Sequence, residues 1–407
     1  MNPIRLCRFE GPDGKAHMGL TDDWASGVVD LTPETGATTI PEWVATLPAG
    51  QGAVLTAAHD LLLRESRTPL DPERLLLPID CAELWAAGVT YEKSRDAREQ
   101  ETTTSGTIYD LVYEAPRPEL FFKAPAGRMA GPGEAVGLRR DAVWHVPEPE
   151  LTVILGPDGA VFGYTVGNDM TARDIEARNP LYLPQAKVFH HSAALGPAVV
   201  LAETVDLGSL TIRLRVSRRG MVVFSGEAEV ARLHRSVPEL LQYLGQEWPL
   251  SPWTGLMTGT GMVPPDYFAL EDGDEIAVAV DEIGTLINVA RRIDESWVPV
   301  APALPRLLRI DPRDNVAVAL GMLAPGYRTA FDDGTVLTLE EAVPFGHKAA
   351  VVPIAQGEPI IKYGAVIGLA RTAIRPGQYV HTHNTEGTRG RGDLGRNPIK
   401  PGEESDR

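Results

Sequence analysis

Two glutamates separated by one residue begin a segment that reads as a β-strand, "EPELTVIL", residues 148–155. Side chains alternate across a strand, so Glu148 and Glu150 are expected on the same face. Carboxylates this close repel each other, and glutamate is depleted in strands. The pair therefore predicts either a solvated sheet edge or a positive group, such as a metal ion, held between the two side chains.

A predicted hairpin brings a third carboxylate to the same face. The turn "GPDG" separates "ELTVIL" from "AVFGYTVGND", and a two-residue Asp-Gly loop would place Asp169 opposite Glu148. Gly167 would then lie opposite Glu150, and any even loop length keeps Asp169 on this face. Such an all-oxygen site suits Mg²⁺, Mn²⁺ or Ca²⁺ better than zinc. We expect a metal there, with a solvated acidic edge as the alternative.

Other polar residues are candidates for substrate binding. Thr258 and Thr260 lie in the glycine-rich turn "MTGTGMVPP", where hydroxyl and backbone N–H groups could bind a substrate carboxylate. This turn is not a dinucleotide-binding loop, because no strand-then-helix frame surrounds it. Lys123 in "LFFKAP" is a weaker candidate, since a lysine after two phenylalanines is more often a strand end.

Two adjacent pairs are interpreted as structural. If His190 and His191 belong to a strand, their side chains face opposite ways, so at most one of them could join a site. We expect the pair to pack in the core or to support the site from behind its ligands. Arg173 is expected to form an ordering ion pair with Asp174, and substrate binding is its alternative role.

A mainly β scaffold with α+β character is expected to position these residues. Short runs rich in β-branched residues alternate with Gly and Pro turns from residue 84 onward. Hairpin strands "IRLCRF" and "KAHMGL" and helices at "AVLTAAHDLLLRE" and "SVPELLQYLGQE" are predicted around them. From the N-terminus onward we expect an α+β unit 1–80, a catalytic domain 81–298, a Pro-rich linker 299–309, a β module 310–385 and a disordered tail 386–407.

Composition limits the possible functions. The 407 residues exceed what one core usually serves, and the net charge of −17 argues against binding the phosphate backbone of nucleic acids. Cys7 and Cys81 cannot form a disulfide framework and lack zinc-site spacing. The sequence has no signal-peptide pattern and no apolar run long enough to span a bilayer. We therefore expect a cytoplasmic protein that binds a small molecule, with no nucleic-acid or membrane partner.

The order of these motifs resembles the fumarylacetoacetate hydrolase superfamily. The Glu-x-Glu pair and hairpin are followed by "GYTVGNDMTARD", "QAKVFHHSAALGP" and "MTGTGMVP", and the resemblance covers residues 84 to 298. It implies a core of curled β-sheets, a divalent metal bound by Glu148, Glu150 and Asp169, and a homodimer or higher homo-oligomer. It also implies a 2-keto acid substrate that undergoes C–C cleavage, decarboxylation or loss of water.

The early core indicates a branch of this superfamily. Many relatives carry an Asn-Tyr-x-x-His segment whose histidine takes part in C–C bond hydrolysis, whereas "TYEKSRDAR" has Ser94 at that position. A hydroxyl in place of an imidazole removes the ready general base for activating water. With "VYEAPRPELFFKA", the segment resembles the 2-keto-3-deoxy-D-arabinonate dehydratase branch and favours elimination over hydrolysis.

This resemblance implies a hydro-lyase that converts a 2-keto-3-deoxypentonate to 2,5-dioxopentanoate through a metal-stabilised enolate. It places a substrate-contacting lysine at Lys187, which would polarise the keto group or transfer the proton. Ser94 and Glu92 would handle the leaving hydroxyl next to the substrate-binding candidate Tyr91, with a plain turn role as the alternative. Two other functions stay open: hydrolysis of a C–C bond in 2,4-diketo sugar acids or acylpyruvates, and non-catalytic sugar-acid binding.

The C-terminal β module resembles the SAF-type β-clip domain of altronate and galactarate dehydratases. The shared features are "GHK", "GEPIIKYG" and "IRPGQYVHTHN". This supports a sugar-acid substrate, although the catalytic body of those enzymes is missing here. His381 and His383, expected on one strand face, could bind a metal or an acidic sugar. The alternative is a dimerising or lid domain with structural histidines.

Overall fold

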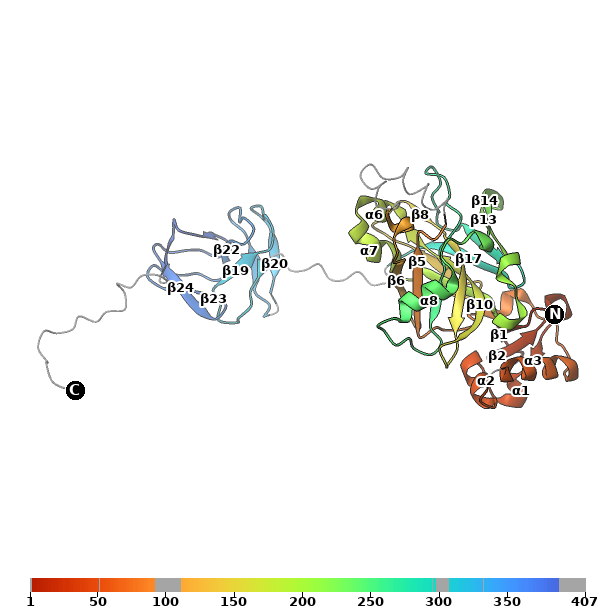
Figure 1. The fold of residues 1–407 in the computed structure, drawn as a ribbon. Coiled ribbons are helices and arrows are strands. Elements are labelled where there is room, and N and C mark those ends of the chain that lie inside the picture. The colour runs from red at the N-terminus through yellow and green to blue at the C-terminus, as the bar shows by residue number, and fades with distance from the viewer. Residues whose placement is uncertain are drawn as a thin grey trace, which may run out of the picture. The chain divides into compact units, whose positions relative to one another are not determined.

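The computed structural model describes residues 2–50, 52–91, 111–294, 296–297, 307–331 and 333–387. The chain divides into two compact units, residues 1–299 and residues 300–407, which carry the red-to-green and the blue colours of Figure 1. Both units are built mainly from strands, so the predicted mainly β class is confirmed. The domain boundaries within the first unit, the linker and the tail stay predictions; residues 298–306 and 388–407 lie outside the described residues.

The N-terminal hairpin joins the largest sheet of the first unit. Strands β1 (Arg5–Glu10) and β2 (Ala16–Thr21) pair in the predicted hairpin, and β1 also pairs with β12 (Ala193–Leu201). The predicted helix α3 (Ala53–Arg64) is present. The other elements of this region are β3 (Val29–Asp30), α1 (Thr32–Thr35), α2 (Ile40–Thr46) and β4 (Leu75–Leu76).

This sheet contains ten strands within the described residues, in the order β3-β2-β1-β12-β10-β9-β15-β5-β6, with β4 paired to β1. The strands that follow the N-terminal region are β5 (Glu83–Gly88), β6 (Glu119–Pro125), β9 (Pro149–Leu155), β10 (Val161–Asp169) and β15 (Gly255–Met257). Strand β9 is buried along its whole length and lies at the centre of this order, which places the sequence-predicted acidic hairpin in the core of the unit.

A second sheet of the unit has the order β14-β13-β16-β17-β7. Its strands are β7 (Ala135–Leu138), β13 (Thr211–Arg218), β14 (Met221–Glu229), β16 (Glu275–Val280) and β17 (Gly284–Arg292). One buried apolar cluster includes Val153 and Val166 from the first sheet and Leu214 and Val278 from the second, so the two sheets share a core. The predicted helix α8 (Val237–Gly245) is capped by the Ser236 hydroxyl.

The second unit contains only strands and turns within its described residues, as the sequence predicts. Its strands are β18 (Leu307–Leu308), β19 (Val316–Ala319), β20 (Arg328–Ala330), β21 (Val336–Thr338), β22 (Lys348–Ala350), β23 (Pro359–Lys362), β24 (Ala365–Ala370), β25 (Tyr379–Val380) and β26 (Thr385–Gly387). They form small sheets, of which β18-β19-β22-β25 is the largest.

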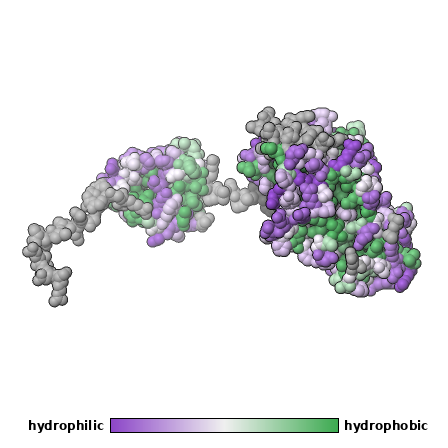
Figure 2. All heavy atoms as spheres, in the orientation of Figure 1, coloured by the Kyte–Doolittle hydropathy of each residue, from purple (hydrophilic) through white to green (hydrophobic). Residues whose placement is uncertain are grey.

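The outer faces of both units are mixed in character. Hydrophilic and hydrophobic residues lie interspersed on the face shown in Figure 2. Among the described residues, the helices are all too short or too polar to cross a bilayer.

Candidate active site

The hairpin of β9 and β10 has the register that the sequence predicts. Gly167 lies opposite Glu150, and the N–H of Asp169 donates to the carbonyl of Glu148 at 2.9 Å. The loop holds three residues and not the predicted two, because the N–H of Gly156 donates to the carbonyl of Ala160 at 2.8 Å. A bulge between Val161 and Gly163 then shifts the pairing by one residue and restores the predicted register at the acidic residues. The prediction that three carboxylates share one face is therefore confirmed at the level of the backbone.

The three carboxylates also converge as side chains. One oxygen from each of Glu148, Glu150 and Asp169 lies within 4.8 Å of the others, and each residue is at most 2% exposed. The solvated edge considered as the alternative is therefore wrong. An oxygen-only, fully buried set of this kind has the donor chemistry of a Mg²⁺, Mn²⁺ or Ca²⁺ site.

Lys187 lies in the middle of this cluster. It ends the short helix α7 (Leu183–Lys187), and its Nζ donates to Glu148 Oε2 at 2.7 Å and to Asp169 Oδ2 at 2.9 Å. A third bond reaches the Thr171 hydroxyl at 2.7 Å, in the short strand β11 (Thr171–Ala172). Three acceptors match the three protons of an ammonium group, so this geometry describes a charged lysine.

Lys123 is a second buried cation in the cluster. Strand β6 pairs with β5 through a register shift at Leu84 and Trp85, which leaves Lys123 as the extra residue of a β-bulge. The side chain is 0% exposed and forms an ion pair with Asp169. It also donates to the carbonyl of Met170 at 3.0 Å. Burial lowers the pKa of Lys123, and the charge of Asp169 opposes this effect.

Arg173 contacts the carboxylates from helix α6 (Arg173–Arg178). Its Nη2 donates to Glu148 Oε1 at 2.7 Å, and its Nε lies 3.6 Å from Glu176. The sequence suggested Asp174 as its partner, but Asp174 accepts a hydrogen bond from the N–H of Val143. Both oxygens of Glu148 are therefore held by cations, Arg173 on one side and Lys187 on the other.

Glu150 is stabilised by a backbone donor from the glycine-rich turn. The N–H of Gly259 donates to its Oε2 at 2.6 Å. Gly259 has a φ of 92°, and a Cβ there would lie 1.9 Å from the Thr90 hydroxyl, so only glycine fits. Burial raises the pKa of Glu150 well above its usual range, and the nearby Asp169 and Glu148 raise it further.

The two threonines of this turn are buried. The Thr258 hydroxyl donates to the carbonyl of Leu151 at 2.9 Å, which ties the turn to β9. The Thr260 hydroxyl accepts from the N–H of Met262 at 3.2 Å. These contacts order the turn near Glu150, and binding of a substrate carboxylate by the threonines stays a prediction.

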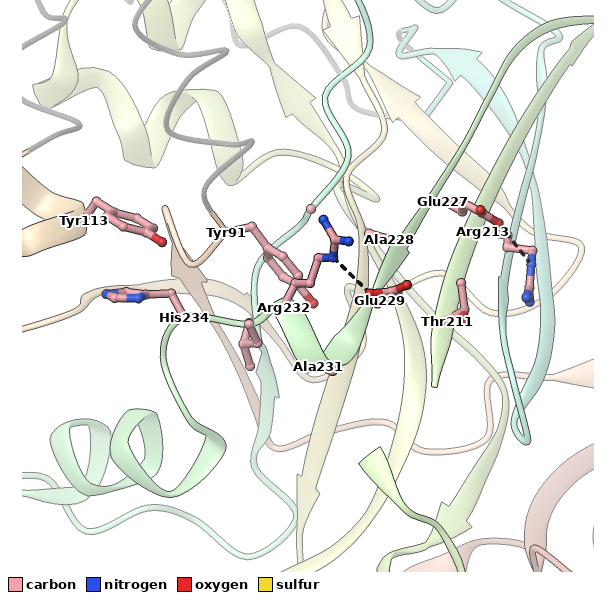
Figure 3. A pocket seen from close by; sticks show the side chains of 12 residues that line it. Tyr91, Tyr113, Thr211, Arg213, Glu227, Ala228, Glu229, Ala231, Arg232 and His234 are labelled. Atoms are coloured by element: carbon pink, nitrogen blue, oxygen red, sulfur yellow. Dashed lines mark hydrogen bonds and ion pairs between the residues drawn. The ribbon is translucent and has the colours of Figure 1, made fainter. Parts of the chain in front are cut away.

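Tyr91 lines a cavity of about 710 Å³. Its ring lines the cavity, and its hydroxyl has no hydrogen-bond partner among the described residues. Burial raises the pKa of this hydroxyl, and the charge of Glu150 raises it further. Other walls, labelled in Figure 3, include Tyr113, Glu229, Arg232 and His234.

The predicted residues Glu92 and Ser94 lie outside the described residues, so their roles stay predictions.

Neither histidine pair lies on a strand, so both strand predictions for them are wrong. His190 and His191 lie in a turn, His191 with a φ of 48°, and their rings stack at 4.2 Å instead of facing opposite ways. In the second unit β25 ends at Val380, so His381 and His383 lie in a turn and not on one strand face.

Three neighbours of the acidic cluster were not predicted from the sequence: Thr171, Glu176 and Gly259. The "MTGTG" turn and the "RDIE" spacing were available signals, because residues three apart meet on a helix.

Comparisons with known proteins agree with this fold. The family model described as fumarylacetoacetate (FAA) hydrolase C-terminal matches residues 85–291, and the one described as altronate/galactarate dehydratase SAF domain matches residues 305–388. Two β-sheets that share a core around a buried acidic hairpin define the class, and the chain belongs to the fumarylacetoacetate hydrolase family. Both resemblances predicted from the sequence are confirmed.

Individual relatives point to one branch. The chain is 41% identical over 223 residues to a 2-dehydro-3-deoxy-D-arabinonate dehydratase of Saccharolobus solfataricus, covering 54% of this chain and 75% of the relative. It is 43% identical over 213 residues to a probable 2-keto-3-deoxyxylonate dehydratase of Haloferax volcanii, covering 52% and 73%. A solved 2-keto-3-deoxy-D-arabinonate dehydratase complexed with magnesium and 2,5-dioxopentanoate is similar with a TM-score of 0.57 and 32% identity, covering 72% of this chain and 99% of the other.

Proposed function

We propose that this protein is a divalent-metal-dependent hydro-lyase that converts a 2-keto-3-deoxypentonate to 2,5-dioxopentanoate. The observation that carries the proposal is the buried convergence of Glu148, Glu150 and Asp169 beside Lys187. The names of the two dehydratases that share more than 40% identity with this chain support the substrate class.

The acidic cluster fits a divalent ion. Its three side chains offer only oxygen, and burial together with two neighbouring carboxylates disfavours the ionised form of Glu150 when no metal is bound. A cation between the three would remove this repulsion. We assign Glu148, Glu150 and Asp169 as the ligands and Mg²⁺ as the ion, with Mn²⁺ or Ca²⁺ as alternatives. The ligand-bound dehydratase structure, which contains magnesium, supports this choice.

The bound ion would act as a Lewis acid that makes the C3 protons of the 2-keto acid acidic. The Lys187 Nζ donates to Glu148, Asp169 and Thr171, so we assign its positive charge to stabilising the negative charge that develops on the keto oxygen, rather than assigning it to removing the proton. The C3 proton and the C4 hydroxyl leave together as water, and tautomerisation places the new carbonyl at C5. Glu92 and Ser94 remain the proposed residues for the leaving hydroxyl.

We assign the hydroxylated end of the substrate to the cavity beside Tyr91. Its polar walls suit a chain of hydroxyl groups, since Arg232 donates to Glu229 at 2.9 Å and His234 stacks on Tyr113 at 4.2 Å. Thr258 and Thr260, on the turn that also supplies the Gly259 N–H, remain proposed contacts for the carboxylate end.

The proposed role of Arg173 changes from substrate binding to support of the site. It is 1% exposed and engaged by Glu148 and Glu176. Lys123, fully buried behind Asp169, is likewise proposed as a supporting cation.

The decisive experiment offers the purified protein a 2-keto-3-deoxypentonate with Mg²⁺ and follows the aldehyde of 2,5-dioxopentanoate by NMR. Glu148→Gln should lower turnover on the order of a thousandfold, because an amide is a poor ligand for a hard cation. Glu247→Gln, at an exposed position, is the matched control. Formation of pyruvate and a second acid from acylpyruvates, without any aldehyde from the pentonate, would instead establish a C–C hydrolase. Binding of sugar acids without turnover would leave the non-catalytic alternative.

A homodimer and a cytoplasmic location complete the proposal. Edge strand β14 exposes Met221, Val222 and Val223 at 69%, 57% and 41%, an apolar surface that a second copy could cover. Light scattering on the purified protein tests this, and Val222→Lys should favour the monomer. Cys7 and Cys81 are buried and unpaired, which is consistent with a reducing compartment.

A further inference from the structure

The second unit gathers three of the nine histidines around one tyrosine ring. The pairing of β22 with β25, in which Ala349 lies opposite Tyr379, brings His347 beside His381, and their rings lie 5.0 Å apart. The Tyr379 ring lies 5.5 Å from His347, 5.4 Å from His381 and 5.6 Å from His383. We refer to these four residues, His347, Tyr379, His381 and His383, as the histidine cluster.

The turn after β25 holds this cluster in place. Asn384 is buried, and its side chain accepts the N–H of His381 at 2.9 Å and donates to the carbonyl of Tyr379 at 2.8 Å. The Thr385 hydroxyl donates to the carbonyl of His381 at 2.8 Å. Such bonds from side chains to the backbone define one local conformation, so the rings are positioned before any ligand binds.

Hydrogen bonds also orient two of the imidazoles. The Tyr379 hydroxyl lies 2.6 Å from Nδ1 of His347, and the Thr382 hydroxyl lies 3.0 Å from Nδ1 of His381. A hydroxyl that donates to an unprotonated Nδ1 leaves the ring proton on Nε2. Neither Nε2 has a hydrogen-bond partner among the described residues, so both N–H groups are available as donors to a ligand.

The charges around the cluster are of one sign. Partial burial lowers the pKa of His381, and three basic neighbours lower it further: His347, Lys348 and His383. Glu341 accepts the backbone N–H of Tyr379 at 3.1 Å. In the part of the chain that the structure describes, no carboxylate forms an ion pair with an imidazole of the cluster. A positive charge there therefore has no counter-ion from these residues, although the whole chain carries −17.

The sequence left two kinds of ligand open for these histidines, a metal ion or an acidic sugar. A metal ion requires several ligand atoms that converge on one point. Among the described residues, Glu148, Glu150 and Asp169 form the one such group of three histidine, cysteine or carboxylate ligands, and the histidine cluster does not. An anion does not need this convergence, because each of its oxygens can accept a separate N–H.

We propose that the histidine cluster is a binding site for the carboxylate of a small polyhydroxy acid. The Nε2–H groups of His347 and His381 donate to the carboxylate, and Lys348 adds positive charge nearby. His383 and the Thr382 hydroxyl are further polar groups, which suit the hydroxyl groups of such an acid. The site uses no residue of the acidic hairpin, so it does not depend on the proposed function.

Nuclear magnetic resonance of the full chain, labelled with ¹⁵N at its nine histidines, tests the site directly. The probe is sodium gluconate, and the matched control is sorbitol, in which a hydroxymethyl group replaces the carboxylate. Gluconate should shift the ring nitrogens of His347 and His381 at concentrations where sorbitol leaves them unchanged. Histidine-to-glutamine variants assign the signals. Equal shifts with the two compounds, or no shift with gluconate, overturn the proposal.

Isothermal titration of gluconate into variants tests the assigned donors. His381→Gln should weaken binding by about tenfold or more, because it removes a hydrogen bond to a charged group. Tyr379→Phe keeps the ring and removes the hydroxyl that orients His347, so it should weaken binding less, and it provides the test should His381→Gln fail to fold by circular dichroism. His59→Gln, in the first unit, is the control. Gluconate that binds both cluster variants as tightly as the wild type contradicts the assignment.

Two other probes decide the class of ligand. Larger ring shifts with inorganic phosphate than with gluconate would overturn the carboxylate assignment. Zn²⁺ alone that binds these imidazoles, in a chain that ignores gluconate, would replace the anion site with a metal site. The outcomes also separate this site from the proposed function: gluconate that shifts no histidine ring overturns the site and leaves the hydro-lyase standing, and a chain without turnover still shows the shifts.

Discussion

His145 makes the stability of the first unit depend on pH in a direction that can be measured. It lies in β8 (His145–Val146), which pairs with β11 next to the acidic cluster, and it is 0% exposed. Its Nε2 accepts the N–H of Arg139 at 2.8 Å, so the ring is neutral with its proton on Nδ1. Burial, and then the charge of Arg292, lowers the pKa of His145 from 6.5 to about 4.

The sign follows from which state binds the proton. Between pH 6.5 and 4 the unfolded chain protonates this histidine while the folded chain keeps it neutral, so acid favours unfolding. The contribution of neutral, buried His145 to the free energy of unfolding is fully present above the pKa of this histidine in the unfolded chain. It is lost as the pH falls through the pKa of the histidine in the folded chain. At 1.36 kcal/mol per pKa unit, the folded state loses about 2 kcal/mol by pH 5 and about 3 kcal/mol by pH 4 from this residue alone.

Urea unfolding followed by tryptophan fluorescence reports on the first structural unit, which contains His145, because all seven tryptophans precede residue 298. His145→Gln keeps an acceptor for the Arg139 N–H and removes the titrating group, so its free energy of unfolding should fall less than that of the wild type between pH 7 and 5, by about 2 kcal/mol. His59→Gln, at a half-buried position of α3, is the control. Parallel pH profiles of wild type and His145→Gln would refute the reasoning.

Three further predictions concern packing and charge. Gly167→Ala should lower the free energy of unfolding by about 1–3 kcal/mol in urea titrations, because a Cβ would lie 2.3 Å from the Thr152 hydroxyl. The control Gly226→Ala, whose Cβ would meet nothing closer than 3.4 Å, should lower the free energy of unfolding less. Arg173→Met should cost about 3–5 kcal/mol, since it removes one of the two buried cations that hold Glu148. Arg64→Met at an exposed pair should cost less than about 1 kcal/mol, and equal losses would contradict this. Burial raises the pKa of both cysteine thiols to about 12, so iodoacetamide should label them only after unfolding. Rapid labelling of the native protein at pH 8 would contradict this prediction.

The acidic hairpin could be predicted from the sequence because its determinants are local. Side-chain alternation fixes the face of Glu148 and Glu150, and the Gly-Pro-Asp-Gly segment marks the turn. The exact register between Glu148 and Asp169 also depends on the bulge between Val161 and Gly163, which the sequence pattern did not predict and which offsets the extra residue in the loop. The same local reasoning failed for His381 and His383, because β25 ends at Val380 and the side chain of Asn384 accepts the N–H of His381, which closes a turn that alternation cannot describe.

The cations that surround the carboxylates required information that no local pattern contains. Lys123 reaches Asp169 because a bulge turns it inward on a strand that pairs with β5, several strands away from the hairpin in the sheet order. From the sequence alone its position after two phenylalanines favoured a strand end over a role in substrate binding. Lys187 arrives on a five-residue helix, too short to show a periodic pattern. Spacing along the chain therefore reveals where negative charge collects, whereas the tertiary fold decides which cations lie beside it.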